Sequence, residues 1–205
     1  MSGPPGPPEP SEETASVPAS PNSPLRLVRG TASIEDIDEF LATLDAVADE
    51  TGAVVQAFDA DLVVSERHLS EATRLAARSI ARGEAVARDP GVEILLYAAG
   101  RRQIDRALEL GVSEGERRTV VLAADFGGVS GAGRSTADLD AAAASIAAAL
   151  SVTDEKSASE GGPLSKYDAD RVREFYGVTD RELAATAGEL PDIVRERVAL
   201  LDVEK

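Results

Sequence analysis

Apolar and polar positions follow one another in segments that predict a domain of helices and short strands. Aliphatic and β-branched runs of strand length occur at 25–30, 53–58 and 118–123, with a further short apolar piece at 62–64. Apolar residues at helical spacing predict helices over 33–52, 65–82, 89–100, 102–110 and 137–150, and three shorter helices that begin near 168, 179 and 191. The expected fold class is α/β (mixed α+β). We expect a single domain, 25–205, in which a small mixed sheet packs against several helices and the C-terminal portion is helical.

Residues with capping chemistry mark the ends of several predicted helices. Ser33 is the expected N-cap of the first helix, with Asp36 able to reach back, and Gly52 stands where that helix should end. Asp89 followed by Pro90 predicts another helix start, because proline lacks only an N–H that would have no partner there.

Three segments lack the apolar positions that a core requires. Residues 1–24 are rich in Pro, Ser and Gly and predict a disordered tail, and 127–135 and 151–165 predict flexible segments. From Gly128 to Ser135 the chain matches a phosphate-binding loop, but Arg134 stands where lysine is usual and replaces it poorly. We interpret this stretch as a connecting loop, and nucleotide binding by 128–135 is the alternative function.

Residues 93–110, EILLYAAGRRQIDRALEL, join two predicted helices through Gly100. The joint gathers the polar side chains of Arg101, Arg102 and Gln103 and has apolar residues on both sides. One interpretation is a binding corner, in which donors for a polar ligand lie beside an apolar stripe for a protein partner. The other is an ordinary helical hairpin buried in the core, and spacing alone does not decide between them.

Charge is distributed unevenly along the chain. There are 37 acidic and 21 basic residues, giving a net charge of −16, and only three of the basic residues are lysines. An acidic chain with arginine in place of lysine is typical of a halophilic source, where salt screens self-repulsion. Residues 67–106 nevertheless carry eight arginines and five acids, and Arg67, Arg74, Arg78 and Arg82 fall on one helical stripe. This segment is a candidate anion-binding face, or else a solvated helix surface.

Several kinds of chemistry have no residues to support them. The chain contains no cysteine, and its single histidine, His68, cannot form a triad or a metal centre alone. Asp59 and Asp61 are more typical of a turn than of a metal site. No apolar run of about 18 residues or secretory signal is present. We therefore expect a cytoplasmic protein that is not an enzyme, with no metal and no cofactor.

The runs VQAFDADLVVSERHLSEA, EILLYAAGRRQIDRALELGV and TVVLA occur in that order and carry a family resemblance. They resemble the PRPK-binding protein family, the small accessory subunit of the KEOPS (EKC) complex. The resemblance spans about 25–125 and resumes more weakly in YDADRVREFYGVTDREL. The Pro-rich head, the glycine loop and 151–165 depart from the family pattern.

The resemblance implies a single α/β domain that acts as a non-catalytic subunit. Such a subunit docks on the kinase-like ATPase of the complex and binds the single-stranded 3′ CCA end of tRNA. The threonylcarbamoyl transferase subunit, an indirect partner, then modifies the adenosine beside the anticodon. The expected tRNA-binding residues are Arg101, Arg102, Gln103, Ile104, His68, Arg74 and Arg78, with Tyr97 as a further stacking surface. The expected partner-binding residues are Ile94, Leu95, Ile104, Ala107 and Leu108.

Overall fold

The computed structural model describes residues 23–150 and 167–203. The predicted linker 151–165 lies outside the described residues, as does nearly all of the predicted tail 1–24. Among the described residues, no helix is both long and apolar enough to cross a membrane.

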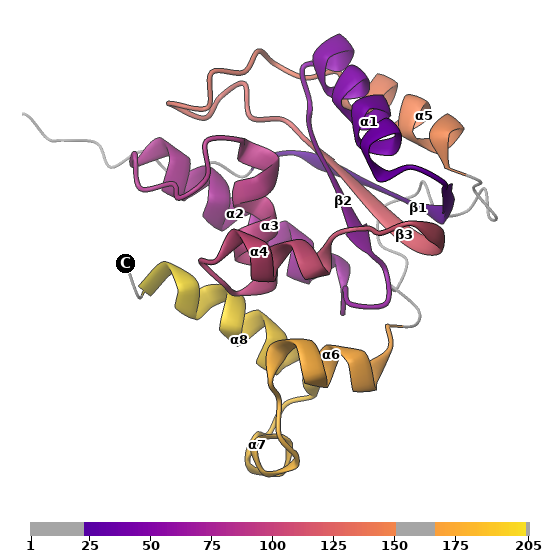
Figure 1. Ribbon diagram of the computed structural model, residues 1–205. Helices are drawn as coiled ribbons and strands as arrows, with labels where there is room; N and C mark the ends of the chain where they lie inside the picture. The colour runs from indigo at the N-terminus through magenta and orange to yellow at the C-terminus, as the bar shows by residue number, and fades with distance from the viewer. Residues whose placement is uncertain (1–22, 151–166, 204–205) are drawn as a thin grey trace, which may run out of the picture.

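Three strands form the sheet of the described chain: β1 (Leu25–Ile34), β2 (Val54–Asp59) and β3 (Gly115–Ala124). Their order is β1-β3-β2, and both pairings are antiparallel. The predicted α+β class is confirmed, but the sheet is antiparallel throughout rather than mixed. The reason is that β3 lies between β1 and β2, so the two strands that run in the same direction are not neighbours (Figure 1).

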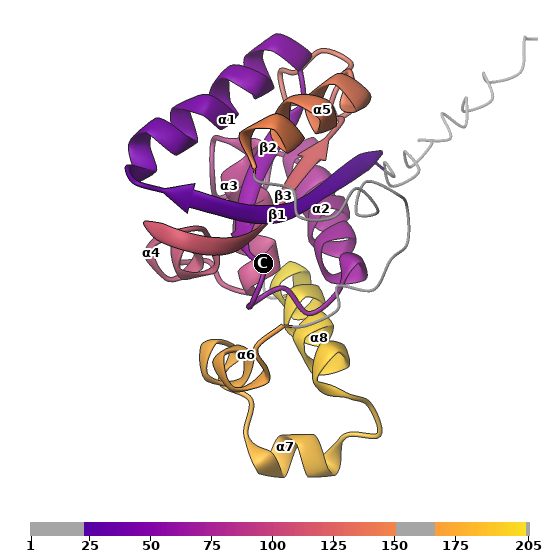
Figure 2. The same cartoon turned by 90° about the vertical axis from the view of Figure 1, so that its right-hand side faces the viewer.

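The central strand is apolar on both faces because helices cover the sheet on both sides. Val120, Leu122 and Ala124 contribute to one core cluster, and Val121 and Ala123 contribute to the other. Helices α1 (Ile37–Thr51) and α5 (Leu139–Ala149) cover the second cluster. Helices α2 (Glu66–Ala81) and α3 (Pro90–Ala99) cover the first, on the opposite side of the sheet (Figures 1 and 2).

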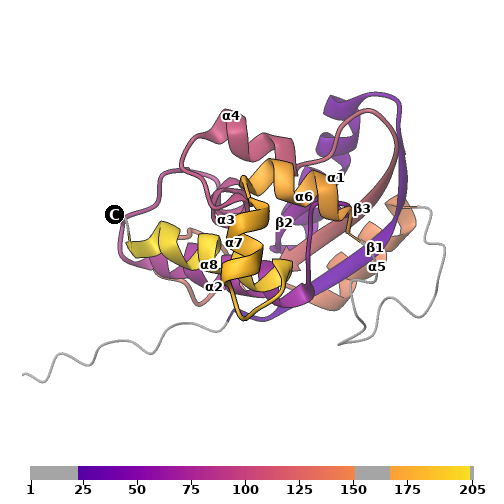
Figure 3. The same ribbon diagram turned by 90° about the horizontal axis from the view of Figure 1, so that it is seen from below.

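The C-terminal portion is helical, as predicted. It consists of α6 (Ala169–Tyr176), α7 (Asp180–Ala185) and α8 (Leu190–Val203). Apolar side chains of α6 and α8 belong to the same core cluster as α2 and α3. Helix α7 buries no residue and projects away from the sheet (Figures 1 and 2), so that in the view from below it lies in front of part of α8 (Figure 3).

Two local predictions are wrong at the start of α1 and after α3. Ser33 does not cap α1, because β1 continues through it and pairs it with Glu116; Asp36 is the N-cap instead. The predicted helix 102–110 is a short helix, α4 (Ile104–Ala107), followed by a 3-10 turn, η1 (Leu108–Leu110). The apolar piece 62–64 is buried but is not a strand. The predicted caps at Gly52 and Asp89 are confirmed.

Candidate functional site

The chain bends at Gly100, between α3 and α4, and this corner packs against α8. Gly100 ends α3 in the left-handed conformation, with φ of 61°, which favours glycine. A Cβ at this position would lie 3.2 Å from the Cβ of Arg197 and 3.4 Å from its carbonyl carbon. The bend therefore depends on glycine both for its backbone conformation and for the close approach of α8.

Arg101 and Arg102 bind the ends of two C-terminal helices. Arg101 donates to the carbonyl oxygen of Phe175, and its guanidinium carbon lies 5.1 Å from the centroid of the Phe175 ring. Arg102 donates to the carbonyl oxygen of Leu201 at 3.5 Å. Both carbonyls lie near helix C-termini, where partial negative charge attracts cations. The sequence did not predict this structural role, and both arginines remain partly exposed.

An open groove of about 580 Å³ lies beside the corner, between the α4–η1 segment and α6. We call it the corner groove. Its walls present three guanidinium groups and two carboxylates, together with an aromatic ring and an aliphatic side chain. The lining residues are Leu62, Arg101, Arg106, Glu109, Arg171, Glu174 and Phe175. Such walls offer hydrogen-bond donors and flat surfaces to a polar, planar ligand.

The short α4–η1 segment separates the corner groove from a small apolar patch. Ile104 and Leu108 are 42% and 53% exposed and lie one helical turn apart. Arg106 and Glu109 point toward the groove, which is roughly the other side of the segment. Gln103, at the start of α4, is exposed and makes no side-chain cap.

Four predicted contact residues instead lie in the core. Ile94, Leu95 and Tyr97 on α3 and Ala107 on α4 are at most 1% exposed. The buried-hairpin interpretation is therefore correct for α3, because the sheet packs on one side of it and α8 on another. The predictions that Ile94, Leu95 and Ala107 bind a partner, and that Tyr97 offers a stacking surface, are inconsistent with this placement.

His68 is also buried, which is inconsistent with its predicted contact with RNA. Its Nε2 lies 2.8 Å from the carbonyl oxygen of Ala98, which also accepts the hydroxyl of Tyr176 at 2.9 Å. Burial lowers the pKa of His68 to about 4, so the ring is neutral at pH 7. Burial likewise raises the pKa of Tyr176, which keeps its hydroxyl protonated as a donor.

The middle of the predicted arginine stripe is not a free basic face, because α8 packs beside it, whereas Arg67 and Arg82 at its ends are exposed. Arg78 forms an ion pair with Asp202 of α8, and the hydroxyl of Tyr97 donates to the same carboxylate at 3.3 Å. Arg74 lies 3.7 Å from Glu71, which also contacts Arg195 of α8. The sequence pattern did not reveal that another helix, α8, packs beside this part of α2.

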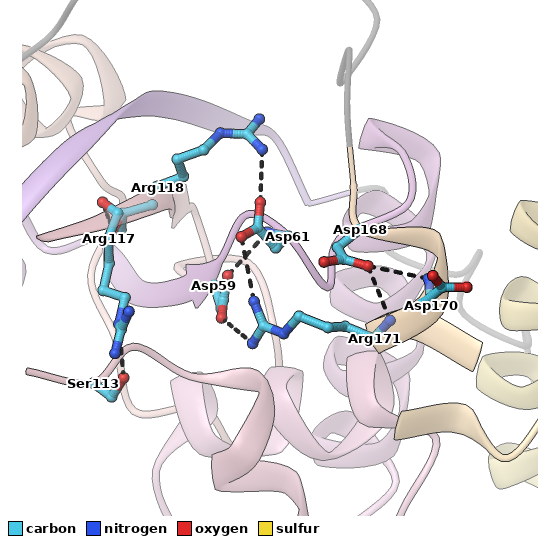
Figure 4. A network of polar contacts seen from close by, with 9 residues as sticks. Asp59, Asp61, Ser113, Arg117, Arg118, Asp168, Asp170 and Arg171 are labelled. Atoms are coloured by element: carbon cyan, nitrogen blue, oxygen red, sulfur yellow. Dashed lines mark hydrogen bonds and ion pairs between the residues drawn. The ribbon is translucent and has the colours of Figure 1, made fainter. Parts of the chain in front are cut away.

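Asp59 and Asp61 form a turn, as predicted, and they also form ion pairs that were not predicted. Asp59 Oδ1 accepts the backbone N–H of Asp61 at 2.9 Å, while its Oδ2 accepts from Arg171 at 2.7 Å. Asp61 accepts from Arg118 at 2.6 Å and from Arg171 at 3.2 Å (Figure 4). The sequence held a signal for these ion pairs, because a carboxylate at the end of a buried strand requires a cationic partner if it is itself buried. Over 23–150 and 167–203, no group of three His, Cys, Asp or Glu residues could hold a metal ion.

The glycine loop does not have the geometry of a phosphate-binding loop. Helix α5 begins at Leu139, four residues after Ser135, and Asp138 caps it. The carboxylate of Asp125 accepts the N–H groups of Gly127 and Ala137 at 2.8 and 3.2 Å. The Asp125 carboxylate thus accepts hydrogen bonds from backbone amides at both ends of the loop. The alternative of nucleotide binding therefore gains no support.

Comparison with known proteins adds a family to this geometry. A family model described as "Kinase binding protein CGI-121" matches residues 34–202, which include the corner groove, the apolar patch and the C-terminal helices except for the last residue of α8. No curated protein matches the sequence. Because the matched residues make up most of the chain, it belongs to the CGI-121 family of kinase binding proteins.

Proposed function

We propose that the chain is a non-catalytic subunit of the KEOPS complex that binds the kinase-like ATPase subunit and the 3′ CCA end of tRNA. In this role it supports the threonylcarbamoyl transferase subunit, which modifies the adenosine beside the anticodon. Membership of a kinase binding family supports the ATPase contact. The observation that carries the RNA contact is the corner groove, which Arg101, Arg106 and Arg171 line together with Phe175, and in which the guanidinium of Arg101 lies over the Phe175 ring.

The groove's chemistry suits a single-stranded RNA end. Unpaired bases are held by hydrogen bonds to their edges and by stacking on aromatic or guanidinium planes. The chain as a whole carries a charge of −16, so long-range attraction to phosphate is unfavourable. The groove itself contains both signs of charge. Short-range contacts to bases therefore account for more of the proposed affinity than phosphate attraction does.

The structure narrows the sets of residues in this proposal. For RNA we retain Arg101 from the groove lining and its neighbours Arg102 and Gln103, and we add Arg106 and Arg171. Ile104 lies in the apolar patch, away from the groove lining, and is left out of the RNA set. Arg78 forms an ion pair with α8, and Arg74 shares Glu71 with Arg195 of α8, so both are left out. For the kinase-like subunit we retain the exposed pair Ile104 and Leu108.

The RNA contact is tested by comparing intact tRNA with the same tRNA lacking its 3′ CCA, using fluorescence anisotropy. We expect binding to weaken about tenfold or more, because each stacked base contributes about 1–3 kcal/mol. Arg106→Gln should weaken binding of intact tRNA in the same assay. The matched control is Arg26→Gln, which also breaks an exposed ion pair but on β1, away from the groove. Equal affinity for the two tRNAs would refute the proposed RNA contact.

A further inference from the structure

Helix α6 forms one wall of the corner groove and is fastened to the end of β2. The carboxylate of Asp168 caps the helix, accepting the N–H groups of Asp170 and Arg171 at 3.1 Å each. The N–H of Asp168 itself donates to the carbonyl oxygen of Asp61 at 2.8 Å. The first turn of α6 is thus joined to the turn that follows β2 (Figure 4).

Arg171 strengthens this junction by bridging two carboxylates. One terminal nitrogen of its guanidinium lies 2.7 Å from Asp59 and the other lies 3.2 Å from Asp61. Arg118 of β3 approaches Asp61 from the other side, at 2.6 Å. The Asp59 side chain is only 10% exposed, so water screens its contact with Arg171 less than it screens a surface ion pair. The hydrogen bond that Arg171 donates to Asp59 also raises the pKa of Arg171.

The position of α6 determines the shape of the groove. Arg171, Glu174 and Phe175 are groove-lining residues from this one helix, and the Phe175 carbonyl holds Arg101. Helix α6 has only eight residues, a length at which a helix is unstable without tertiary contacts. A substitution in the turn after β2 should therefore displace α6, and with it the groove wall that α6 forms.

We propose that Asp59 and Asp61 are positioning residues for the corner groove, which hold Arg171 and thereby place α6 for ligand binding. This inference rests on the proposed function, since the ligand is the single-stranded 3′ end of an RNA. For variants that neutralise these carboxylates, the proposal predicts a change in RNA affinity opposite to the change that charge repulsion alone would cause. Two carboxylates near the groove repel phosphate, so neutralising them would tighten RNA binding if repulsion were their only effect.

The test uses the variants Asp59→Asn and Asp61→Asn in the full chain. Asparagine keeps an oxygen that can accept the N–H of Asp61, so the turn after β2 is preserved while the ion pair is lost. We expect binding of an RNA with a 3′ CCA end to weaken about tenfold, a typical effect of losing a charge-assisted hydrogen bond. We expect Asp59→Asn to leave the salt dependence of binding unchanged, because it removes no phosphate contact. Tighter or unchanged binding would overturn the proposal.

A second measurement does not depend on RNA. Amide hydrogen exchange over 172–176 should become faster in Asp59→Asn, because α6 loses its anchor. Unchanged exchange there would also overturn the proposal. If the wild-type chain binds no RNA, the proposed function fails, while this exchange measurement still decides whether the carboxylates position α6.

Two controls separate positioning from general loss of stability. Asp140→Asn removes the partner of Arg26 on the other side of the sheet and should change neither RNA binding nor exchange in α6. Leu44→Ala creates a cavity in the core cluster beneath α1 and lowers global stability without touching the groove. If Leu44→Ala, at equal loss of stability, weakened RNA binding as much as Asp59→Asn, the positioning role would be refuted.

Discussion

His68 and Tyr176 share one acceptor, the carbonyl oxygen of Ala98, at the C-terminal end of α3. Because that oxygen accepts, the Nε2 of His68 carries the proton. Its Nδ1 is buried without a hydrogen-bond partner in the described chain. This arrangement joins α2, α3 and α6 at one point, and a positive charge on the ring would be poorly solvated there. The only histidine is therefore a structural residue of the core.

Stability should consequently fall as the pH is lowered. The pKa of His68 is about 4 in the folded chain and about 6.5 when unfolded, so the unfolded chain binds the proton first. The contribution of His68 is fully present above pH 6.5 and is lost as the pH falls toward 4. Between pH 7 and pH 5 it should amount to about 2 kcal/mol of unfolding free energy.

This is measured by urea unfolding of wild type and His68→Gln at the two pH values. Glutamine can still donate to the Ala98 carbonyl but does not titrate. The variant should lose about 2 kcal/mol less than wild type over this interval, although the acidic residues contribute equally to both. Identical losses in the two proteins would show that His68 does not resist protonation.

Residue types alone located the polar corner but not the side chains that face solvent. Arg101 and Arg102 were recognised as hydrogen-bond donors, and they are, but their acceptors include the ends of α6 and α8. Those acceptors are about 75 and 100 residues away along the chain, and no local pattern encodes such a distance. Asp59 was recognised as a turn residue for the same local reason, while its partner Arg171 was missed.

At the level of elements, the loop between β3 and α5 is closely packed at its beginning. A Cβ on Gly127 would lie 2.5 Å from the backbone nitrogen of Thr136, whereas nothing lies within 4 Å of a Cβ on Gly128. Gly127→Ala should therefore destabilise the fold by about 1–3 kcal/mol, since the backbone must move. Gly128→Ala, the adjacent control, should be nearly neutral. Thermal unfolding of both variants checks this, and equal midpoints would contradict the packing described here.

The apolar side of α4 and η1 provides a test of partner binding. Leu108→Asp and Ile104→Asp should each weaken binding to the kinase-like subunit about tenfold or more, because burying an aliphatic side chain contributes about 1.5–3 kcal/mol. Both residues are exposed, so the free chain should remain stable. Leu41→Asp on α1, at 40% exposure, is the matched control and should bind normally. A pull-down in which all three variants recover the partner equally would exclude this patch.

The sequence predicted which segments form helices and strands better than it predicted where those elements end or which elements lie beside one another. Long periodic helices such as α1 and α2 were predicted because their apolar stripes are repeated over many turns. The end of β1 was misplaced because its last residues pair with the exposed half of β3, where alternation of apolar residues is weak. The order of strands was missed because pairing between β1 and β3 joins residues about 90 positions apart.

At the level of the whole molecule, the C-terminal helices complete both the core and the candidate site. They bury residues against α2 and α3, and α6 forms one side of the corner groove. The acidic surplus did not prevent this arrangement, because arginines of α2, α6 and α8 pair with carboxylates on neighbouring elements. The groove was not predictable from 93–110 alone, since three of its seven lining residues come after 166 and one, Leu62, comes before 93.

The most direct test of the RNA site is a photo-cross-link from a tRNA whose 3′-terminal adenosine carries an azide, followed by mass spectrometry. The cross-linked residues should fall within 101–109 and 171–175, on the two sides of the corner groove. Omitting light or adding excess unlabelled tRNA should abolish the products. Cross-links concentrated on α1, or on the loop 127–135, would contradict the assignment of the groove as the seat of the RNA end.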